Sequence, residues 1–159
     1  MKFNKVSIRN FRSYYGRNNI YEFSTDPKKP ITVIVGTNGG GKSSLMLAIQ
    51  WCLFGDDIVG IEKGKYANES IRHQASSDDK IYSVELTFEH NGQSYVCERG
   101  TNDSNPFFII KTIDEDGNRG AREENPQRLI NSILPQHLKN WFFYNAEGTK
   151  GKKANTLDN

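Results

Sequence analysis

The sequence predicts an α/β fold with a mixed β-sheet and flanking helices, and three observations lead to that prediction. The run from Ile31 to Val35 is short, apolar and β-branched, and it is bounded by Pro30 and Gly36, as expected of a strand buried on both faces. A glycine-rich segment follows it directly. Apolar residues then recur at helical spacing from about Ser43 to Phe54, and Gly55 offers a C-terminal cap.

Further strands are predicted on both sides of this unit. Alternation of apolar and polar residues indicates strands near residues 5–9, 20–23, 81–89, 94–99 and 107–113. The dipeptide Asn91-Gly92 suits the positive φ angles of a tight hairpin turn between two of them. The chain therefore opens with a sheet and returns to it after the helix.

The remaining segments are predicted as follows. A helix begins at Asn125 and Pro126, an N-cap and first-turn pair, and ends before Pro135. Residues 141–144 read as a final buried strand, and residues 56–80 as a long loop or insertion. The predicted domains are a lobe over residues 1–148 and a flexible tail over residues 149–159, which has almost no apolar content.

Composition narrows the class of protein. The net charge of +2 is too small to indicate nucleic-acid binding by itself. Cys52 and Cys97 lack CxxC spacing, so a reduced, cytoplasmic chain is expected. No segment approaches the ~20 apolar residues of a membrane span, so no membrane partner is expected. Zinc binding is not expected either, since metal-ligand spacing is missing around the three histidines, His73, His90 and His137.

The glycine-rich segment carries the chemistry. Residues Gly36 to Ser43 read GTNGGGKS and match GxxxxGK[ST], the P-loop pattern, between a predicted strand and a predicted helix. Glycines let backbone N–H groups face phosphate oxygens, and the helix start adds a positive dipole end. Lys42 would reach the β- and γ-phosphates, the Ser43 hydroxyl would bind magnesium, and Ser44 could add a phosphate contact. ATP and Mg²⁺ are the predicted cofactors; the alternative is a turn that only connects the two elements.

The wider pattern resembles a known superfamily. VSIRNFRSY, GTNGGGKSS, WCLFG and WFFYNAEG are similar to segments of the N-terminal lobe of SMC-like ATPases, over most of residues 1–148. Within that superfamily the chain resembles the SbcC-type DNA-repair ATPases and, in closest appearance, the DndD proteins of bacterial DNA sulfur modification. The resemblance implies a P-loop NTPase fold, namely the N-terminal lobe of an ABC/SMC-type ATPase head.

The resemblance also implies particular site residues. Arg12 matches an arginine that contacts nucleotide phosphate, and a guanidinium there would give bidentate hydrogen bonds. The basic stretch around Arg12 could instead touch DNA phosphates, and a solvated strand-end charge is the simplest alternative. Asn145 matches the Q-loop glutamine, which would make it a magnesium ligand with Ser43, and Glu147 could contribute through water. The implied phosphate cradle is Asn38, Gly39, Gly40, Gly41, Lys42, Ser43 and Ser44.

The resemblance finally implies what the chain needs from elsewhere. In an SMC-type head a second lobe supplies the acidic residues for hydrolysis and a dimer partner presents a signature loop, and neither is recognised in this sequence. We therefore assign no catalytic residue and expect ATPase activity only with a C-terminal lobe and a second head. A fragment of a longer protein is expected, with a natural split subunit as the alternative.

The expected function is Mg-ATP binding that couples head engagement to DNA repair, modification or phage defence. DNA and a nuclease or modification complex are the expected partners. Two alternatives remain open at this point: the ATPase lobe of an overcoming-lysogenisation-defect-type nuclease, and a non-catalytic nucleotide-sensing module.

Overall fold

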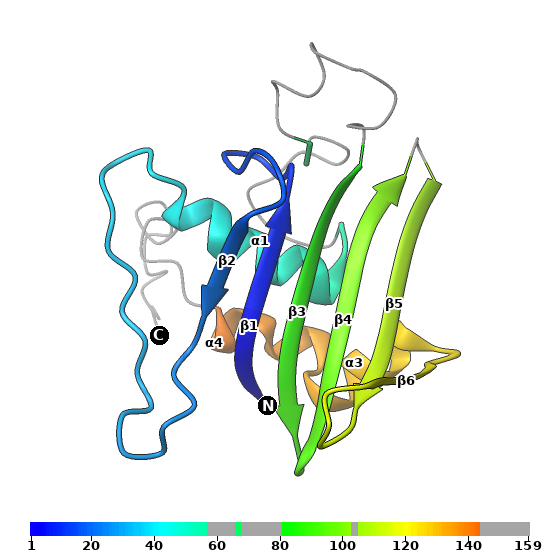
Figure 1. Ribbon diagram of the computed structural model, residues 1–159. Helices are drawn as coiled ribbons and strands as arrows, with labels where there is room; N and C mark the ends of the chain where they lie inside the picture. Colours follow the sequence, from blue (N-terminus) through cyan, green and yellow to red (C-terminus); the bar gives the residue numbers. More distant parts are fainter. Residues whose placement is uncertain (57–65, 68–80, 103–104, 144–159) are drawn as a thin grey trace, which may run out of the picture.

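The computed structural model describes residues 1–56, 66–67, 81–102 and 105–143 (Figure 1). Within them one six-stranded sheet has the order β2-β1-β3-β4-β5-β6, and each of its pairings is antiparallel. The strands are β1 (Lys2–Arg9), β2 (Asn19–Glu22), β3 (Tyr82–His90), β4 (Gln93–Asn102), β5 (Asn105–Ile113) and β6 (Arg119–Arg122). The helical elements are α1 (Lys42–Phe54), α3 (Pro126–Ile133), the 3-10 turn η2 (Gln136–Leu138) and α4 (Lys139–Phe142).

The strands follow the alternation in the sequence. Val6 and Ile8 of β1 are fully buried, and so are the apolar residues Val84 and Leu86 that β3 places beside them. The β3–β4 hairpin turns at Asn91 and Gly92, whose φ angles are 51° and 77°, so the predicted turn is confirmed. β6 was not predicted, because its four residues are all exposed and carry no apolar alternation.

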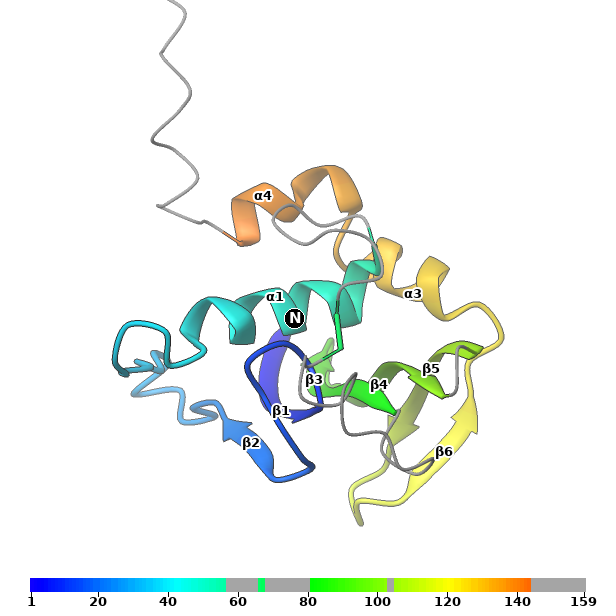
Figure 2. The same ribbon diagram turned by 90° about the horizontal axis from the view of Figure 1, so that it is seen from above.

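Helix α1 covers one face of the sheet, together with α3 and α4 (Figure 2). Eight of its thirteen residues are buried, and the predicted helix is confirmed. Gly55 ends it with φ 66° and an N–H bonded to Trp51 O at 2.8 Å. Cys52 meets Cys97 of β4 with the two Sγ atoms 3.5 Å apart, and burial raises the pKa of the Cys97 thiol. Both cysteines are free thiols at the helix–sheet contact.

The predicted buried strand at residues 31–35 is wrong. This segment forms no strand and lies beyond β2 in Figure 1, with Ile31 exposed by 78%, Val33 by 76% and Val35 by 88%. The apolar, β-branched pattern of residues 31–35 indicates a tendency to be buried, whereas a strand also requires a hydrogen-bonding neighbour. Within the described chain the sheet ends at β2, so this neighbour is not provided.

The predicted strand at residues 141–144 is also wrong over its described part. The 3-10 turn after Pro135 leads directly into α4, with Phe143 N–H bonded to Lys139 O at 2.9 Å. Trp141 is exposed by 84% and Phe142 by 61%, while Phe143 lies against the ring of Phe3 with centroids 6.4 Å apart. Helical hydrogen bonds near Pro135 outweigh the β propensity of the aromatic run.

The predicted helix starting at Asn125 and Pro126 is confirmed as α3, although the Asn125 side chain makes no capping hydrogen bond. Most of residues 56–80 and the whole of 149–159 lie outside the described residues, so the predicted loop, tail and domain division stay predictions. Among the described residues, none of the helices combines the length and the apolar character needed to cross a lipid bilayer.

Candidate nucleotide-binding site

The N-terminal end of α1 is shaped for an anion. Its N-cap is Gly41, with a left-handed φ of 91°, and no side chain caps the helix or places a carboxylate in its first turn. The Gly41 carbonyl accepts the Leu45 N–H at 2.9 Å, which starts the helical ladder. The first-turn N–H groups and the positive end of the helix dipole therefore point into the space in front of the helix, where they would stabilise an anion.

The loop before the helix is held by its own backbone. Gly40 donates its N–H to Thr37 O at 3.0 Å, and a Cβ on Gly40 would lie 3.0 Å from that same oxygen. Lys42 Nζ donates to Gly36 O at 2.7 Å and to Thr37 O at 2.8 Å. The ammonium group is therefore folded over the exposed loop, where phosphate oxygens can replace the two carbonyls as acceptors.

A hollow of about 410 Å³ lies in front of the helix start. It is lined by Ser13, Asn38, Gly39, Gly41, Lys42, Ser43 and Ser44. The structure thus brings together six of the eight predicted phosphate-contacting residues. Gly40 forms the turn behind them, and Arg12 precedes Ser13 with φ 51° and its N–H bonded to Tyr66 O at 2.9 Å. A phosphate contact by the Arg12 guanidinium remains a prediction.

Two site residues were missed by the sequence analysis. Ser13 Oγ lies 3.0 Å from Ser44 Oγ, and Tyr14 donates its hydroxyl to Gly41 O at 3.0 Å. Tyr14 is only 7% exposed, and burial, followed by its neighbour Tyr21, raises the pKa of Tyr14 above its usual range. The only sequence signal for these two residues was their position directly after residues 10–12 (NFR). Contacts between residues roughly thirty positions apart leave no local pattern in a sequence.

The loop that carries Ser13 and Tyr14 is anchored by Asn10. This residue is 3% exposed, and its side chain accepts the Gly16 N–H at 2.8 Å while donating to Ile81 O at 2.9 Å. Both side-chain ends are thus satisfied inside the fold. The anchor fixes the loop to the start of β3 and holds Ser13 and Tyr14 against the P-loop.

The hollow fits magnesium nucleotide by its donor set. Mg²⁺ usually takes one or two protein oxygens, with phosphates and water completing the shell. Ser43 lines the hollow, and its hydroxyl can supply one such oxygen. Asn145 and Glu147 lie outside the described residues, and no cluster of three His, Cys, Asp or Glu side chains occurs among the described ones. Magnesium ligation by Ser43 and Asn145 therefore stays a prediction.

Comparison with known proteins gives a consistent result. A family model described as "AAA domain" matches residues 5–157. Exonuclease subunit 2 of Enterobacteria phage T4 is 36% identical over 99 residues, which are 62% of this chain and 16% of the phage protein. The DNA double-strand break repair Rad50 ATPase of Methanococcus maripaludis is 34% identical over 155 residues, 96% of this chain and 14% of that protein. The chain thus spans about a sixth of these relatives.

A solved structure shares the fold. It comes from work described as "Structural biochemistry of ATP-driven dimerization and DNA stimulated activation of SMC ATPases". The TM-score is 0.50 at 21% sequence identity, and the match covers 94% of this chain and 84% of that one. Together with the family match, it confirms the predicted fold class, a P-loop domain of the SMC ATPase head type.

Proposed function

Because this chain belongs to the AAA-domain family, we propose that it is the N-terminal lobe of a Rad50- and SbcC-like ATPase head that binds Mg-ATP through residues 36–44. The observation that carries the proposal is the uncapped start of α1, which faces a hollow lined by Lys42, Ser43 and Ser44. Amides, ammonium and hydroxyls converge there without an acidic side chain in the first helical turn. That combination suits a triphosphate and its metal ion.

Hydrolysis in this proposal requires a C-terminal lobe and a second head. The exposed apolar segment at residues 31–35 supports it, since an added strand beside this segment would complete its hydrogen bonding. The action would be on DNA. Support comes from the names of the relatives, one an exonuclease subunit and the other a DNA double-strand break repair ATPase. A nuclease is therefore the proposed partner, and DNA sulfur modification or phage defence is a narrower variant.

The nucleotide-binding part is tested by calorimetric titration with Mg-ATP. Replacing Lys42 by Ala removes a charge-assisted contact, which is typically about 1.5–3 kcal/mol, so we expect Kd to rise by roughly tenfold or more. Lys29→Ala is the matched control, since Lys29 is an exposed lysine in the loop before the P-loop, and it should leave Kd unchanged. Equal Kd values for wild type and Lys42→Ala would contradict the proposal.

The hydrolysis part is tested by measuring ATP turnover of the chain alone and with a Rad50-type C-terminal lobe added in trans. We expect turnover only in the mixture. Turnover by the chain alone at the rate of the mixture would exclude a need for the second lobe.

A further inference from the structure

One wall of the P-loop hollow comes from outside the P-loop. Among the described residues that line the hollow, only Ser13 lies outside residues 38–44. Ser13 belongs to the loop between β1 and β2, and its side chain is exposed. Its Oγ lies 3.0 Å from the Oγ of Ser44, a residue in the first turn of α1 that is 5% exposed. A hydroxyl that the P-loop pattern does not include therefore borders the phosphate-binding space.

The backbone that leads to Ser13 is strained and firmly packed. Asn10 and Arg12 have φ angles of 54° and 51°, in the left-handed region that residues other than glycine rarely adopt. Phe11 between them is fully buried, and its ring centroid lies 5.3 Å from that of Trp51. Strain of this kind persists only where surrounding contacts maintain it, and it is concentrated at binding and active sites. The conformation of the loop is therefore consistent with a binding role for the exposed residue that follows.

The residue after Ser13 is held in place as well. Tyr14 is 7% exposed, donates its N–H to Phe11 O at 2.9 Å and donates its hydroxyl to Gly41 O at 3.0 Å. These two bonds connect the loop to the N-cap of α1. Because the residues on both sides of Ser13 are fixed before a ligand binds, little conformational entropy is lost when Ser13 contacts that ligand.

The two serine hydroxyls leave one proton for a ligand. A hydroxyl has one proton to donate, and in the Ser13–Ser44 pair one hydroxyl donates to the other. Neither hydroxyl makes a further hydrogen bond within the described part of the chain. Whichever serine donates, the proton of the other is left over, and both residues line the hollow. The neighbouring Lys42 ammonium and the first-turn N–H groups are donors too, so an anion is the ligand that fits.

We propose that Ser13 is a further phosphate-binding residue, whose hydroxyl acts together with that of Ser44 to donate a hydrogen bond to a phosphate oxygen of the nucleotide. This inference rests on the proposed function, because it takes the nucleotide phosphates to lie in the P-loop hollow. The binding site then extends beyond the P-loop to the loop between β1 and β2. Since a hydroxyl carries no charge, its removal weakens binding without abolishing it.

The test is calorimetric titration of wild type and Ser13→Ala with two probes, Mg-ATP and magnesium tripolyphosphate. Tripolyphosphate has phosphates but no nucleoside. We expect Ser13→Ala to raise the Kd of both probes by the same factor, about tenfold, as for the loss of one hydrogen bond to a charged group. Ser13→Thr keeps the hydroxyl and should bind both probes like wild type. A higher Kd for Mg-ATP alone would indicate a contact with the nucleoside and overturn the proposal.

The same titrations separate this inference from the proposed function. If wild type binds Mg-ATP, Lys42→Ala weakens it and Ser13→Ala leaves Kd unchanged, the inference about Ser13 is wrong and the proposed function stands. If wild type binds neither probe, the proposed function is wrong, and the inference fails with it. Ser132→Ala is the matched control, since Ser132 is an exposed serine in α3 whose hydroxyl donates to Leu129 O at 2.8 Å, and it should leave Kd unchanged.

Two further measurements test whether the serine pair contacts the phosphate directly. In a double-mutant cycle, Ser13→Ala combined with Ser44→Ala should raise Kd by less than the product of the two single effects, because the hydroxyls act as one unit. Effects that multiply fully would overturn the pairing. In phosphorus NMR at saturating Mg-ATP, a bound phosphate resonance should shift between wild type and Ser13→Ala. Identical spectra of the bound nucleotide would overturn a direct contact.

Discussion

Tyr14 is the residue that joins the first strand to the start of α1. Its hydroxyl donates to Gly41 O at 3.0 Å, and a Cβ on Gly41 would lie 3.1 Å from the same hydroxyl oxygen. Glycine is needed at position 41 both for this close approach and for its φ of 91°. The buried tyrosine thus fixes the carbonyl at the N-cap and, through it, the direction of the first-turn amides.

Replacing Tyr14 by Phe is predicted to cost about 0.5–1.5 kcal/mol of the free energy of unfolding, the usual net value of one buried hydrogen bond. Mg-ATP binding should weaken with it, because Gly41 is less firmly placed. Chemical denaturation and calorimetry measure the two effects. Tyr15→Phe is the control, since Tyr15 is 58% exposed, and it should leave both quantities unchanged.

Tyr14 is also expected to make the free energy of unfolding depend on pH. Burial raises the pKa of Tyr14 in the folded protein above the ordinary value of about 10. Its contribution to stability is therefore fully present below pH ~10 and is lost as the pH rises above that value. Tyr14→Phe should show a smaller loss of unfolding free energy between about pH 8 and about pH 11 than wild type. Identical pH profiles for the two proteins would contradict this account.

At the scale of elements, the β4–β5 hairpin depends on one glycine. Gly100 pairs with Phe107, and a Cβ on Gly100 would lie 2.5 Å from Phe107 Cζ and 2.8 Å from Ser83 Cβ. Such distances leave no room for a methyl group. The glycine lets the Phe107 ring lie across the neighbouring strand, an arrangement in which an aromatic residue covers a strand glycine.

Gly100→Ala is predicted to lower the free energy of unfolding by about 1–3 kcal/mol, since extra volume forces side chains and backbone apart. Gly36→Ala is the steric control, because a Cβ there meets nothing closer than Lys42 Cγ at 3.8 Å. Urea denaturation compares the two variants. A Gly100→Ala protein as stable as Gly36→Ala would show that the hairpin adjusts without cost.

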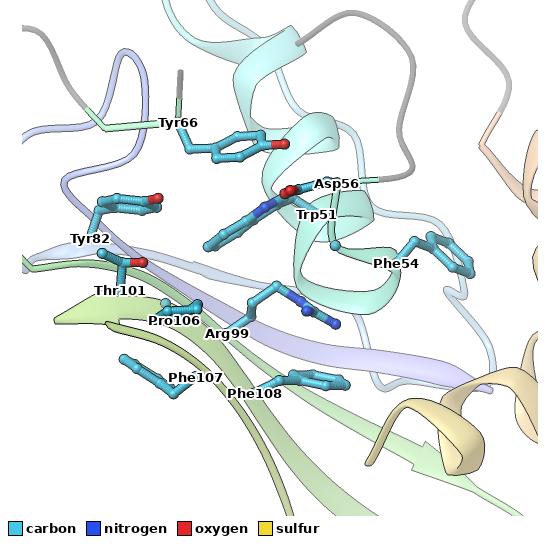
Figure 3. Close-up of a pocket in the computed structure, with 12 residues that line it drawn as sticks. Trp51, Phe54, Asp56, Tyr66, Tyr82, Arg99, Thr101, Pro106, Phe107 and Phe108 are labelled. Carbon is cyan, nitrogen blue, oxygen red and sulfur yellow. The ribbon is translucent and has the colours of Figure 1, made fainter. Parts of the chain in front are cut away.

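The sequence predicted the elements whose signals are local. β1, β3, β4 and α1 follow from alternation, the Asn91-Gly92 turn and a helical apolar repeat, and the P-loop follows from its pattern between them. The wrong predictions concern segments whose structure depends on contacts with other parts of the molecule. Residues 31–35 have the composition of a buried strand but no neighbouring strand in the described sheet. Trp141 belongs to helix α4, because the 3-10 turn before it continues directly into that helix. The cavity at the C-terminal end of α1 (Figure 3) is lined from five places in the chain, namely the end of α1, Tyr66 and the ends of β3, β4 and β5, and so it left no local pattern in the sequence.

At the scale of the whole molecule, large apolar side chains are gathered on exposed segments. Ile31, Val33 and Val35 are exposed by 78%, 76% and 88%, while Trp141 and Phe142 of α4 are exposed by 84% and 61%. Exposed apolar surface of this kind commonly marks an interface. In the proposed function the segment at residues 31–35 lies against the C-terminal lobe.

Replacing Ile31, Val33 and Val35 together by Ser is predicted to leave the free energy of unfolding within about 0.5 kcal/mol of wild type, as for other exposed positions. Self-association of the chain alone should fall, which light scattering after size-exclusion chromatography would detect. Val84→Ser gives the contrast, because Val84 is fully buried and its replacement should destabilise the core. A large loss of stability in the triple variant would mean that residues 31–35 already belong to the core.

The central claim is that residues 36–44 bind the phosphates of Mg-ATP. Amide hydrogen exchange with and without Mg-ATP tests it most directly, because it locates the bound ligand on the chain. We predict that exchange slows about tenfold or more in the segment from Gly36 to Leu45, stays unchanged across β3 and β4, and slows less in Lys42→Ala at the same sub-saturating concentration of Mg-ATP. Protection confined to the residues around Trp51, or none at saturating Mg-ATP, would contradict the claim.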